Sequence, residues 1–278
     1  MSVLSSFLGM GKRLRQISDK LDQHSRALAA INKRLAQADL KAPAAGEQGS
    51  DADWQIGAYG NFSLLLNRRS LVDATLLDTG FWDIPQMERL FGLASRMGDG
   101  RTTFLDIGSY FGLYAFAALD TGRCAQVMAF EANQLNYWQL LANYRMNFDR
   151  CQTLSVHFNA VSDREGVSFS QCTSDNRGAA RIGASEARGA MPCPNIVLDS
   201  ALEKLEGENL VIKIDVEGHE ASVLQGMRNL LSRNRVVMQV EVWQPNLPRV
   251  TAALEGIGLV AQGSIEEDLY FTKGLPAD

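Results

Sequence analysis

Glycines and acids that directly follow apolar runs are the residues of this sequence best placed to do chemistry. The segment Asp106–Gly112, DIGSYFG, follows an apolar run and holds two glycines four residues apart. Glycine permits a tight turn and a close approach of the backbone to a ligand. The next apolar run ends at Glu131, where a carboxylate is placed to accept the two ribose hydroxyls of a nucleoside. Together the turn and the acid indicate a ligand of the adenosine type.

A second group of polar residues lies in the segment VIKIDVEGHE and in the strand-like segment after it. Strand alternation puts Lys213, Asp215 and Glu217 on one side. A lysine inside an apolar strand needs a partner, and Glu241 is the expected one. With His219, these acids form a candidate catalytic cluster near one strand end.

A general base is the chemistry that this cluster suggests. His219 is the first candidate because its unperturbed pKa lies near neutrality. Glu217 and Glu241 come next, and Asp215 is expected to orient the acceptor. A local hydrogen bond at a helix start is the alternative role for His219. No metal site is expected, and a divalent ion on Asp215 and Glu217 is the less favoured alternative.

Strands and helices alternate from residue 54 onward, which predicts a mostly parallel sheet with helices on both faces. Residues 54–80 are strand-like, with open pairing. The expected helices are 83–97, 111–120, 134–148, 201–205, 221–231 and 246–257. The expected strands are 103–107, 125–131, 153–161, 166–171, 209–215 and 236–243. The last two strands, 258–264 and 268–274, are expected to form an antiparallel pair.

The N-terminal segment 1–41 has a different character. Apolar residues recur there at alternating spacings of three and four, which is typical of a coiled-coil seam. The a positions are Leu14, Leu21, Leu28 and Leu35, and the d positions are Ile17, His24 and Ile31. Leucine at a with isoleucine at d favours a homo-oligomer that is a trimer or tetramer rather than a dimer. A helix packed on its own domain is the alternative.

The boundaries between domains follow from composition. Residues 42–53, APAAGEQGSDAD, form a linker of small and acidic residues, and residues 54–278 form the catalytic domain. Ahead of the seam, an apolar stretch followed by Lys12, Arg13 and Arg15 suggests docking on an anionic membrane surface. A solvated terminus is the alternative, and docking on a glycan-assembly enzyme is a further one.

Charge and composition exclude several classes of protein. The 278 residues carry a net charge of -5, but residues 1–41 hold eight basic and three acidic residues while the rest hold 19 and 29. An acidic body does not favour nucleic acid. The four cysteines form no CxxC, and with three histidines they offer no zinc-ligand spacing. The sequence therefore predicts a reduced, cytoplasmic enzyme, with the alternative of peripheral attachment at the inner face of the membrane.

The motifs taken in order resemble the FkbM family of S-adenosylmethionine-dependent methyltransferases. They are FLDIGSYFGLYA, AFEAN, NAVSD, VLDSAL, IKIDVEGHEASVLQGM and VEVW, and they span roughly residues 100–245. The resemblance implies a seven-stranded Rossmann-like sheet with a reversed last hairpin. It also implies methyl transfer to an oxygen of a sugar or a sugar-derived product, here a bacterial surface polysaccharide or its precursor.

The resemblance also implies roles for individual residues. Near the methionine and ribose it places Gly108, Ser109, Tyr110 and Gly112, with Asp106 supporting the turn or the cofactor amine. Glu131 would hold the ribose, and Asp215 would face the methionine end and the acceptor. Beside the adenine it places Ala132, Asn133, Ala160 and Val161. The family commonly has Asn where Tyr110 stands and Pro where Ala132 stands, so Tyr110 has an open role.

Two other classes of function stay open at this point. One is a nucleotide-sugar or nicotinamide oxidoreductase, although the fingerprint GxGxxG is absent. The other is a coiled-coil scaffold with a degenerate methyltransferase domain. The polar segment 172–195 carries three arginines, which suit either an anionic glycan or a solvated loop. Trp243 shares a strand face with Glu241 and is the best candidate for stacking on a sugar ring.

Overall fold

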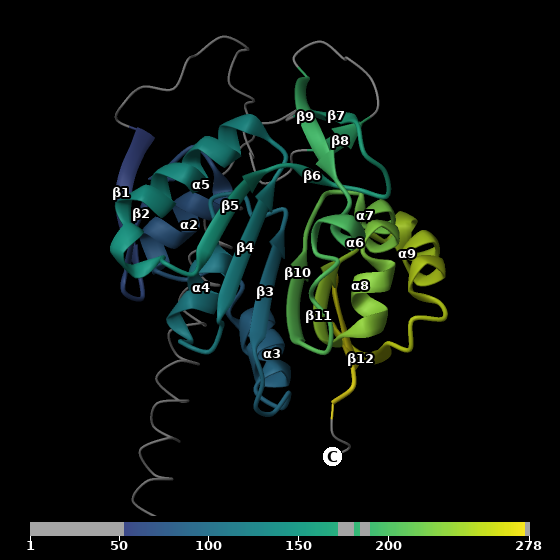
Figure 1. Cartoon of the computed structure of the whole chain (residues 1–278). Helices are drawn as coiled ribbons and strands as arrows, with labels where there is room; N and C mark the ends of the chain where they lie inside the picture. Colours follow the sequence, from purple (N-terminus) through teal and green to yellow (C-terminus); the bar gives the residue numbers. More distant parts are fainter. Residues whose placement is uncertain (1–52, 172–180, 184–189, 276–278) are drawn as a thin grey trace, which may run out of the picture.

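The computed structural model describes residues 53–171, 181–183 and 190–275. Its centre is a seven-stranded sheet with the order β12-β13-β11-β10-β3-β4-β5, in which β13 runs against all the others (Figure 1). The strands are β3 (Thr102–Ile107), β4 (Gln126–Glu131), β5 (Leu154–Phe158), β10 (Asn209–Ile214), β11 (Arg235–Glu241), β12 (Val260–Ile265) and β13 (Asp268–Lys273). The predicted fold class and the antiparallel last pair are therefore confirmed.

Helices cover both faces of this sheet, because neighbouring residues of each buried strand point to opposite sides. Phe104 belongs to the apolar core on one face, and Leu105 belongs to the core on the other. The first face is covered by α2 (Leu71–Thr79), α3 (Ile84–Ala94), α4 (Leu113–Asp120) and α5 (Gln134–Met146). The second face is covered by α6 (Leu198–Ala201), α7 (Glu220–Gly226), α8 (Arg228–Arg233) and α9 (Leu247–Leu254).

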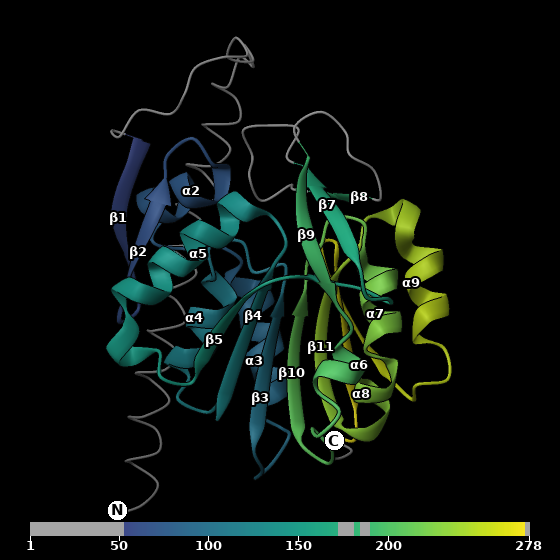
Figure 2. The same ribbon diagram turned by 45° about the horizontal axis from the view of Figure 1, so that its top comes forward.

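Two smaller sheets accompany the central one. The hairpin β1 (Trp54–Tyr59) and β2 (Phe62–Asn67) packs beside α5. The second small sheet has the order β6-β9-β7-β8, and it stands at the end of the molecule where the central parallel strands finish (Figure 1, Figure 2). Its strands are β6 (Ala160–Val161), β7 (Val167–Gln171), β8 (Arg181–Gly183) and β9 (Met191–Ile196).

Two predicted elements differ from the structure. The helix expected at 201–205 shares only residue 201 with α6, and the other difference is at residues 71–79. Residues 71–79 were expected to be strand-like, but they form helix α2. Gly80 ends this helix in the left-handed conformation at φ 76°, and its N–H donates to the Leu76 carbonyl. Thr75 and Thr79 direct their hydroxyls to the carbonyls four residues earlier, so their polar groups are satisfied within the helix.

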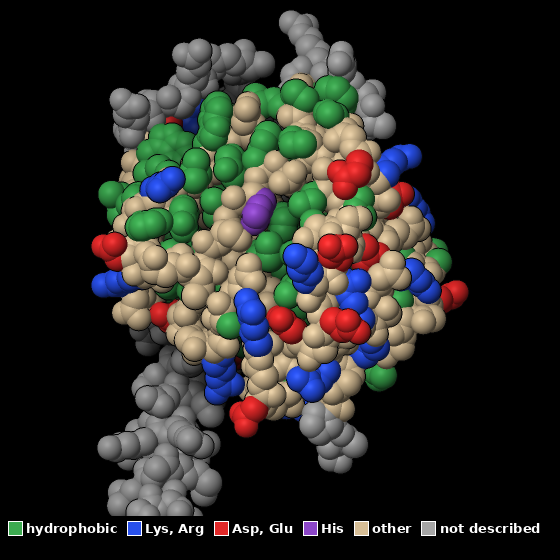
Figure 3. Space-filling view, viewed as in Figure 1, with side chains coloured by type: hydrophobic (Ala, Val, Ile, Leu, Met, Phe, Trp, Pro, Cys, Tyr) green, Lys and Arg blue, Asp and Glu red, His purple; other side chains and the backbone are tan. Residues whose placement is uncertain are grey.

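The surface of the described part divides by residue type. In Figure 3, apolar side chains gather over β1, β2 and α5, and both signs of charge are interspersed over α6, α8 and α9. On α5 the exposed apolar side chains are Leu135, Trp138 and Met146. Within the described ranges, no helix is long and apolar enough to cross a bilayer. The predicted seam of residues 14–35 and nearly all of the linker lie outside the described residues.

Candidate functional site

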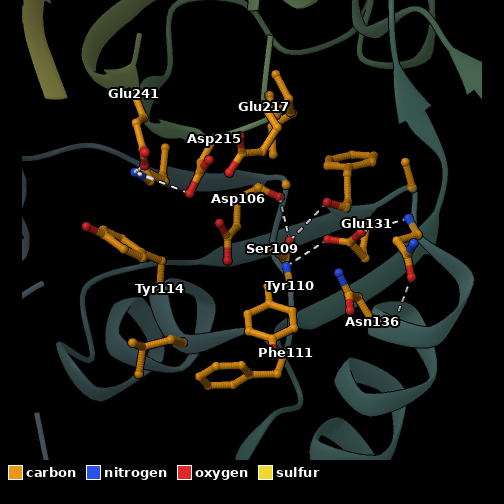
Figure 4. A pocket seen from close by; sticks show the side chains of 18 of the residues that line it. Asp106, Ser109, Tyr110, Phe111, Tyr114, Glu131, Asn136, Asp215, Glu217 and Glu241 are labelled. Carbon is orange, nitrogen blue, oxygen red and sulfur yellow. Dashed lines mark hydrogen bonds and ion pairs between the residues drawn. The ribbon is translucent and has the colours of Figure 1, made fainter. Parts of the chain in front are cut away.

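A cavity of about 390 Å³ opens at the edge where β3, β4, β10 and β11 end, as expected when the carboxyl ends of parallel strands meet (Figure 4). Most of the predicted site residues line it together. They are Asp106, Gly108, Ser109, Tyr110, Glu131, Ala132, Asn133, Ala160, Val161, Asp215, Glu217 and Glu241. Two predicted residues, Gly112 and His219, are not among the residues that line it.

Gly108 allows two strand ends to approach each other. Its backbone has φ 83°, and its N–H and that of Ser109 donate to the Phe130 carbonyl at 2.9 and 3.0 Å. A Cβ atom on Gly108 would lie 1.7 Å from the carbonyl oxygen of Asp215. The sequence predicted a close approach of backbone to ligand, whereas the approach in the structure is between the ends of β3 and β10.

Glu131 is fixed in the wall of the cavity by two backbone N–H groups. Its Oε2 accepts from Tyr110 at 2.7 Å, and its Oε1 accepts from Asn133 at 2.7 Å (Figure 4). Burial raises the pKa of Glu131 to about 7, against the effect of these hydrogen bonds. A carboxylate oxygen can accept more than one hydrogen bond, so Glu131 can also accept hydrogen bonds from ligand hydroxyls. This buried acceptor set suits the ribose of an adenosine-type cofactor.

Asp106 supports the start of α4. Its Oδ2 accepts from the Ala115 N–H at 3.0 Å, and burial raises its pKa to about 7. Gly112 stands just before α4 at φ 98°, and a Cβ there would lie 2.7 Å from Leu140 Cδ1. The left-handed backbone and the close packing against α5 therefore both favour glycine at position 112. Gly112 does not line the cavity.

Tyr110 and Asn133 have their side chains engaged within the protein. The Tyr110 backbone has a left-handed φ of 51°, and its hydroxyl donates to Ser70 Oγ at 2.7 Å, just before α2. Asn133 Oδ1 accepts from the N–H groups of Leu135 and Asn136, so this side chain caps α5. Tyr110 thus connects the Asp106–Gly112 turn to the start of α2 through its hydroxyl, a role that the sequence left open.

Lys213 gathers the acids at the other end of the cavity. Its Nζ lies 3.1 Å from Asp268, 3.6 Å from Glu241 and 3.9 Å from Asp215, and it is 2% exposed. The expected pairing with Glu241 is confirmed. Asp268 was missed, because it enters the cluster through the antiparallel pairing of β13 with β11, which sets it opposite Glu241. We call the part of the cavity around Lys213 the acceptor end.

Two of these carboxyl groups have strongly altered acidity. Burial and the charge of Asp215 raise the pKa of Glu241 to about 8, against the attraction of Lys213. Burial raises the pKa of Asp215 to about 6, and Lys213 opposes this shift. A carboxylate with a pKa near the working pH is well matched to take a proton. Glu241 and Asp215 are therefore both able to exchange a proton near neutral pH.

His219 lies away from these acids. It precedes α7, and its Nε2 is 3.1 Å from Ser162 Oγ, beside β6. Burial lowers its pKa. The structure therefore does not bring His219 to the cavity. His219 does stand at a helix start, as its alternative role requires, but its ring contacts Ser162 on a distant segment and makes no side-chain capping bond to α7. The reason is that the turn after Glu217 directs His219 to the face covered by α7, which strand alternation does not reveal.

The ring of Trp243, a residue that lines the cavity, lies beside the guanidinium of Arg181. Trp243 is 47% exposed. The guanidinium carbon of Arg181, on β8, is 5.7 Å from the centre of the Trp243 ring. Within the described residues, no group of three or more His, Cys, Asp or Glu side chains is arranged to hold a metal ion.

Replacing Glu241 by glutamine should stabilise the protein in alkaline solution. A carboxyl group whose pKa is raised on folding favours the folded state below its unfolded pKa, and this contribution is lost as the pH rises to the folded pKa of about 8. Glu241→Gln removes that loss. Urea unfolding at pH 5 and pH 9 should show a variant with a flatter pH dependence than the wild type and greater stability at pH 9. Equal stability of the two proteins at pH 9 would contradict the assignment.

The family model of the methyltransferase FkbM domain matches residues 106–258, more than half of the chain. Among solved structures, methyltransferase FkbM from Methylobacillus flagellatus KT has 15% identity and a TM-score of 0.42, over 72% of this chain and 60% of that one. M. jannaschii TYW2 in complex with AdoMet has 10% identity and a TM-score of 0.40, over 81% and 86% of the two chains. M. capricolum TrmK with S-adenosyl-homocysteine has 11% identity and a TM-score of 0.38, over 66% of each chain.

All three TM-scores are below 0.5, so only the match to the family model assigns the chain to a family. The chain also spans only 60% of the length of the Methylobacillus protein that it resembles. Among curated protein sequences, none matches this chain.

Proposed function

Because this chain belongs to the FkbM methyltransferase family, we propose that it transfers the methyl group of S-adenosylmethionine to a hydroxyl of a sugar or glycan. The methyltransferase class and its cofactor come with the family, and the acceptor is the proposed part. One observation carries the proposal: the fixed carboxylate of Glu131 and the Lys213 acid cluster line the same cavity. This arrangement supports a nucleoside site and a proton-accepting site within one cavity.

The residues of the cavity suggest a division of labour. Glu131 would bind the ribose hydroxyls, and the Asp106–Gly112 turn would hold the methionine end. The bound cofactor supplies an electrophilic methyl group, and the protein mainly aligns the acceptor oxygen with it. Glu241 would take the hydroxyl proton, Asp215 would orient the hydroxyl, and Trp243 would pack against the sugar ring. Asp268 would hold Lys213 in place, since its Oδ1 accepts from both Lys213 and Gln239.

Calorimetry with S-adenosylmethionine tests the cofactor site. We expect the wild type to bind it and Glu131→Ala to lose about 3 kcal/mol, roughly 100-fold in affinity, because two charge-assisted hydrogen bonds disappear. Glu165→Ala is the control, since Glu165 is exposed and outside the cavity. Unchanged binding by Glu131→Ala would refute the assignment. A preference for NAD over S-adenosylmethionine would instead favour the oxidoreductase class.

The setting of the reaction is also a proposal. We place the protein in the cytoplasm or at the inner face of the membrane, methylating a bacterial surface polysaccharide or its precursor. Residues 1–41 would assemble a homo-oligomer or attach the catalytic domain of residues 54–278 to a glycan-assembly enzyme or membrane, through the linker 42–53. The proposal is supported by the a/d seam and by the opposite charge of the two parts.

Charged substitutions in the seam test its role in assembly. A full-length variant carrying Leu21→Glu and Leu28→Glu places charges at two a positions, where burial without a partner is costly. In analytical ultracentrifugation we expect a trimer or tetramer for the wild type and monomers for the variant. Changing the outer residues Gln23→Glu and Ala30→Glu instead should leave the assembly intact. A monomeric wild type would remove the assembly role.

A further inference from the structure

Apart from Asp106 and Glu131, seven carboxyl groups line the cavity, and Lys213 is the only lysine or arginine among the described residues that line it. Asp215, Glu241 and Asp268 surround Lys213. The others are Asp83, Glu217, Glu266 and Glu267. Asp83 belongs to the same group, because the charges of Lys213, Asp268 and Glu241 all act on its pKa, which burial raises to about 6. The acceptor end is therefore strongly acidic.

Lys213 has no capacity left for an anionic ligand. Its ammonium group is within 4 Å of three carboxylates, and it lies 5.1 Å from the centre of the Tyr114 ring. The side chain is 3% exposed, so a ligand has little access to it. Among the described residues, Arg181 is a further cation that acts on the cavity, because it lies over Trp243 and lowers the pKa of Glu217. An acidic sugar would meet more repulsion than attraction here.

Glu217 is an acid that the fold places in the cavity at a cost. Its backbone has a left-handed φ of 52°, a conformation that costs a non-glycine residue about 1 kcal/mol or more. Burial and the charge of Glu241 raise the pKa of Glu217, which means that its charged form lacks full compensation. Figure 4 shows its side chain beside Asp215, on the cavity side of the chain. A cationic ligand would stabilise the charged form of Glu217.

The cofactor alone does not account for so many carboxylates. The sulfonium of S-adenosylmethionine carries a positive charge that is lost during methyl transfer, and the cofactor's α-ammonium, which persists, is accompanied by the cofactor's own carboxylate. Carboxylates that served only the sulfonium would bind the ground state better than the transition state and would slow the reaction. A positive charge that persists through the reaction has no such penalty, because it is bound equally before and after transfer.

We propose that the acceptor is a hydroxyl compound bearing an amine, such as an amino sugar, whose ammonium is bound by Glu217 and the neighbouring carboxylates of the acceptor end. This inference rests on the proposed methyl transfer and narrows its substrate class. An ammonium offers three donors and fits a site whose free valences are oxygen acceptors. The anionic glycan that the arginines of residues 172–195 suggested is replaced as the favoured substrate.

Three methyl glycosides of matched size test the inference. Methyl glucosaminide carries an ammonium, methyl glucoside carries a hydroxyl and methyl glucuronide carries a carboxylate. NMR titrations of full-length protein saturated with S-adenosylhomocysteine should show the glucosaminide binding roughly 10- to 100-fold more tightly than the glucoside, the range for a hydrogen bond to a charged group. The glucuronide should bind most weakly of the three.

Variants locate the preference within the site. Glu217→Gln should lose most of the preference for the glucosaminide while keeping its affinity for S-adenosylhomocysteine. Glu206→Gln makes the same charge change on an exposed residue outside the cavity and should keep the preference. A glucosaminide that binds no more tightly than the glucoside, or a preference that survives Glu217→Gln, overturns the inference. Failure to bind S-adenosylhomocysteine would instead overturn the proposed function.

Discussion

Replacing Gly108 by alanine is expected to abolish binding of S-adenosylmethionine and to destabilise the fold by about 3 kcal/mol or more. The new Cβ would lie 1.7 Å from the Asp215 carbonyl oxygen and 2.7 Å from the carbonyl carbon. These are backbone atoms, so the clash cannot be relieved by rotating a side chain. The ends of β3 and β10 would have to separate. That movement would displace both the Asp106–Gly112 turn and the carboxyl groups around Lys213.

Gly122 provides the matched control for this substitution. It also has a left-handed φ, 65°, but nothing lies within 4 Å of the Cβ position. Gly122→Ala should therefore show only the backbone strain, about 1–2 kcal/mol, and should bind the cofactor normally. Urea unfolding would compare the stability of the two variants, and calorimetry would compare their affinity for the cofactor. The difference between them gives the effect of the steric clash beyond that of the backbone strain. A Gly108→Ala protein that matches Gly122→Ala in stability and affinity would show that the close approach of the two strands is unimportant.

Replacing Glu241 by glutamine is expected to lower the rate of methyl transfer by about 10²–10⁴-fold, the usual contribution of a general base. Glutamine keeps the size of the side chain but cannot take a proton. Cofactor affinity should change little, because Glu241 is at the acceptor end of the cavity. The gain in alkaline stability described above, together with a loss of activity, is the pattern expected of a residue retained for function.

The pH profile gives this prediction a second measurement. The active form of a base is deprotonated, so wild-type kcat/KM should rise with pH and level off above about 8, the pKa of Glu241. Glu203→Gln, at an exposed position outside the cavity, should keep both the rate and the profile. A Glu241→Gln enzyme with near-normal turnover would show that another group accepts the proton.

The cavity was predictable to the extent that it depends on parallel strands. Asp106, Glu131, Asp215 and Glu241 each lie at or near the end of an apolar run, and the carboxyl ends of parallel strands share one edge of a sheet. Their positions in the sequence were therefore enough to bring them together. The roles of the residues that line the cavity stay predictions until variants are measured.

The features that the sequence did not predict depend on tertiary structure, which local sequence patterns do not encode. Asp268 joins the cluster through the register of the antiparallel pair β11 and β13, whose strands are far apart in the sequence. The direction of His219 depends on the turn that leads into α7, and there its ring meets Ser162. Residues 71–79 carry apolar and β-branched side chains typical of strands, but Gly80 and the tertiary packing against β2 favour a helix.

Transfer of an isotopic label tests the central claim most directly. The protein would be incubated with S-adenosylmethionine carrying a deuterated methyl group and with methyl glucosaminide, and the products would be examined by mass spectrometry and NMR. We predict that the label appears on a hydroxyl oxygen of the sugar, that the amine stays unmodified, and that Glu241→Gln forms far less product. A label on the nitrogen, or no labelled sugar from a protein that binds the cofactor, would contradict this account of the cavity.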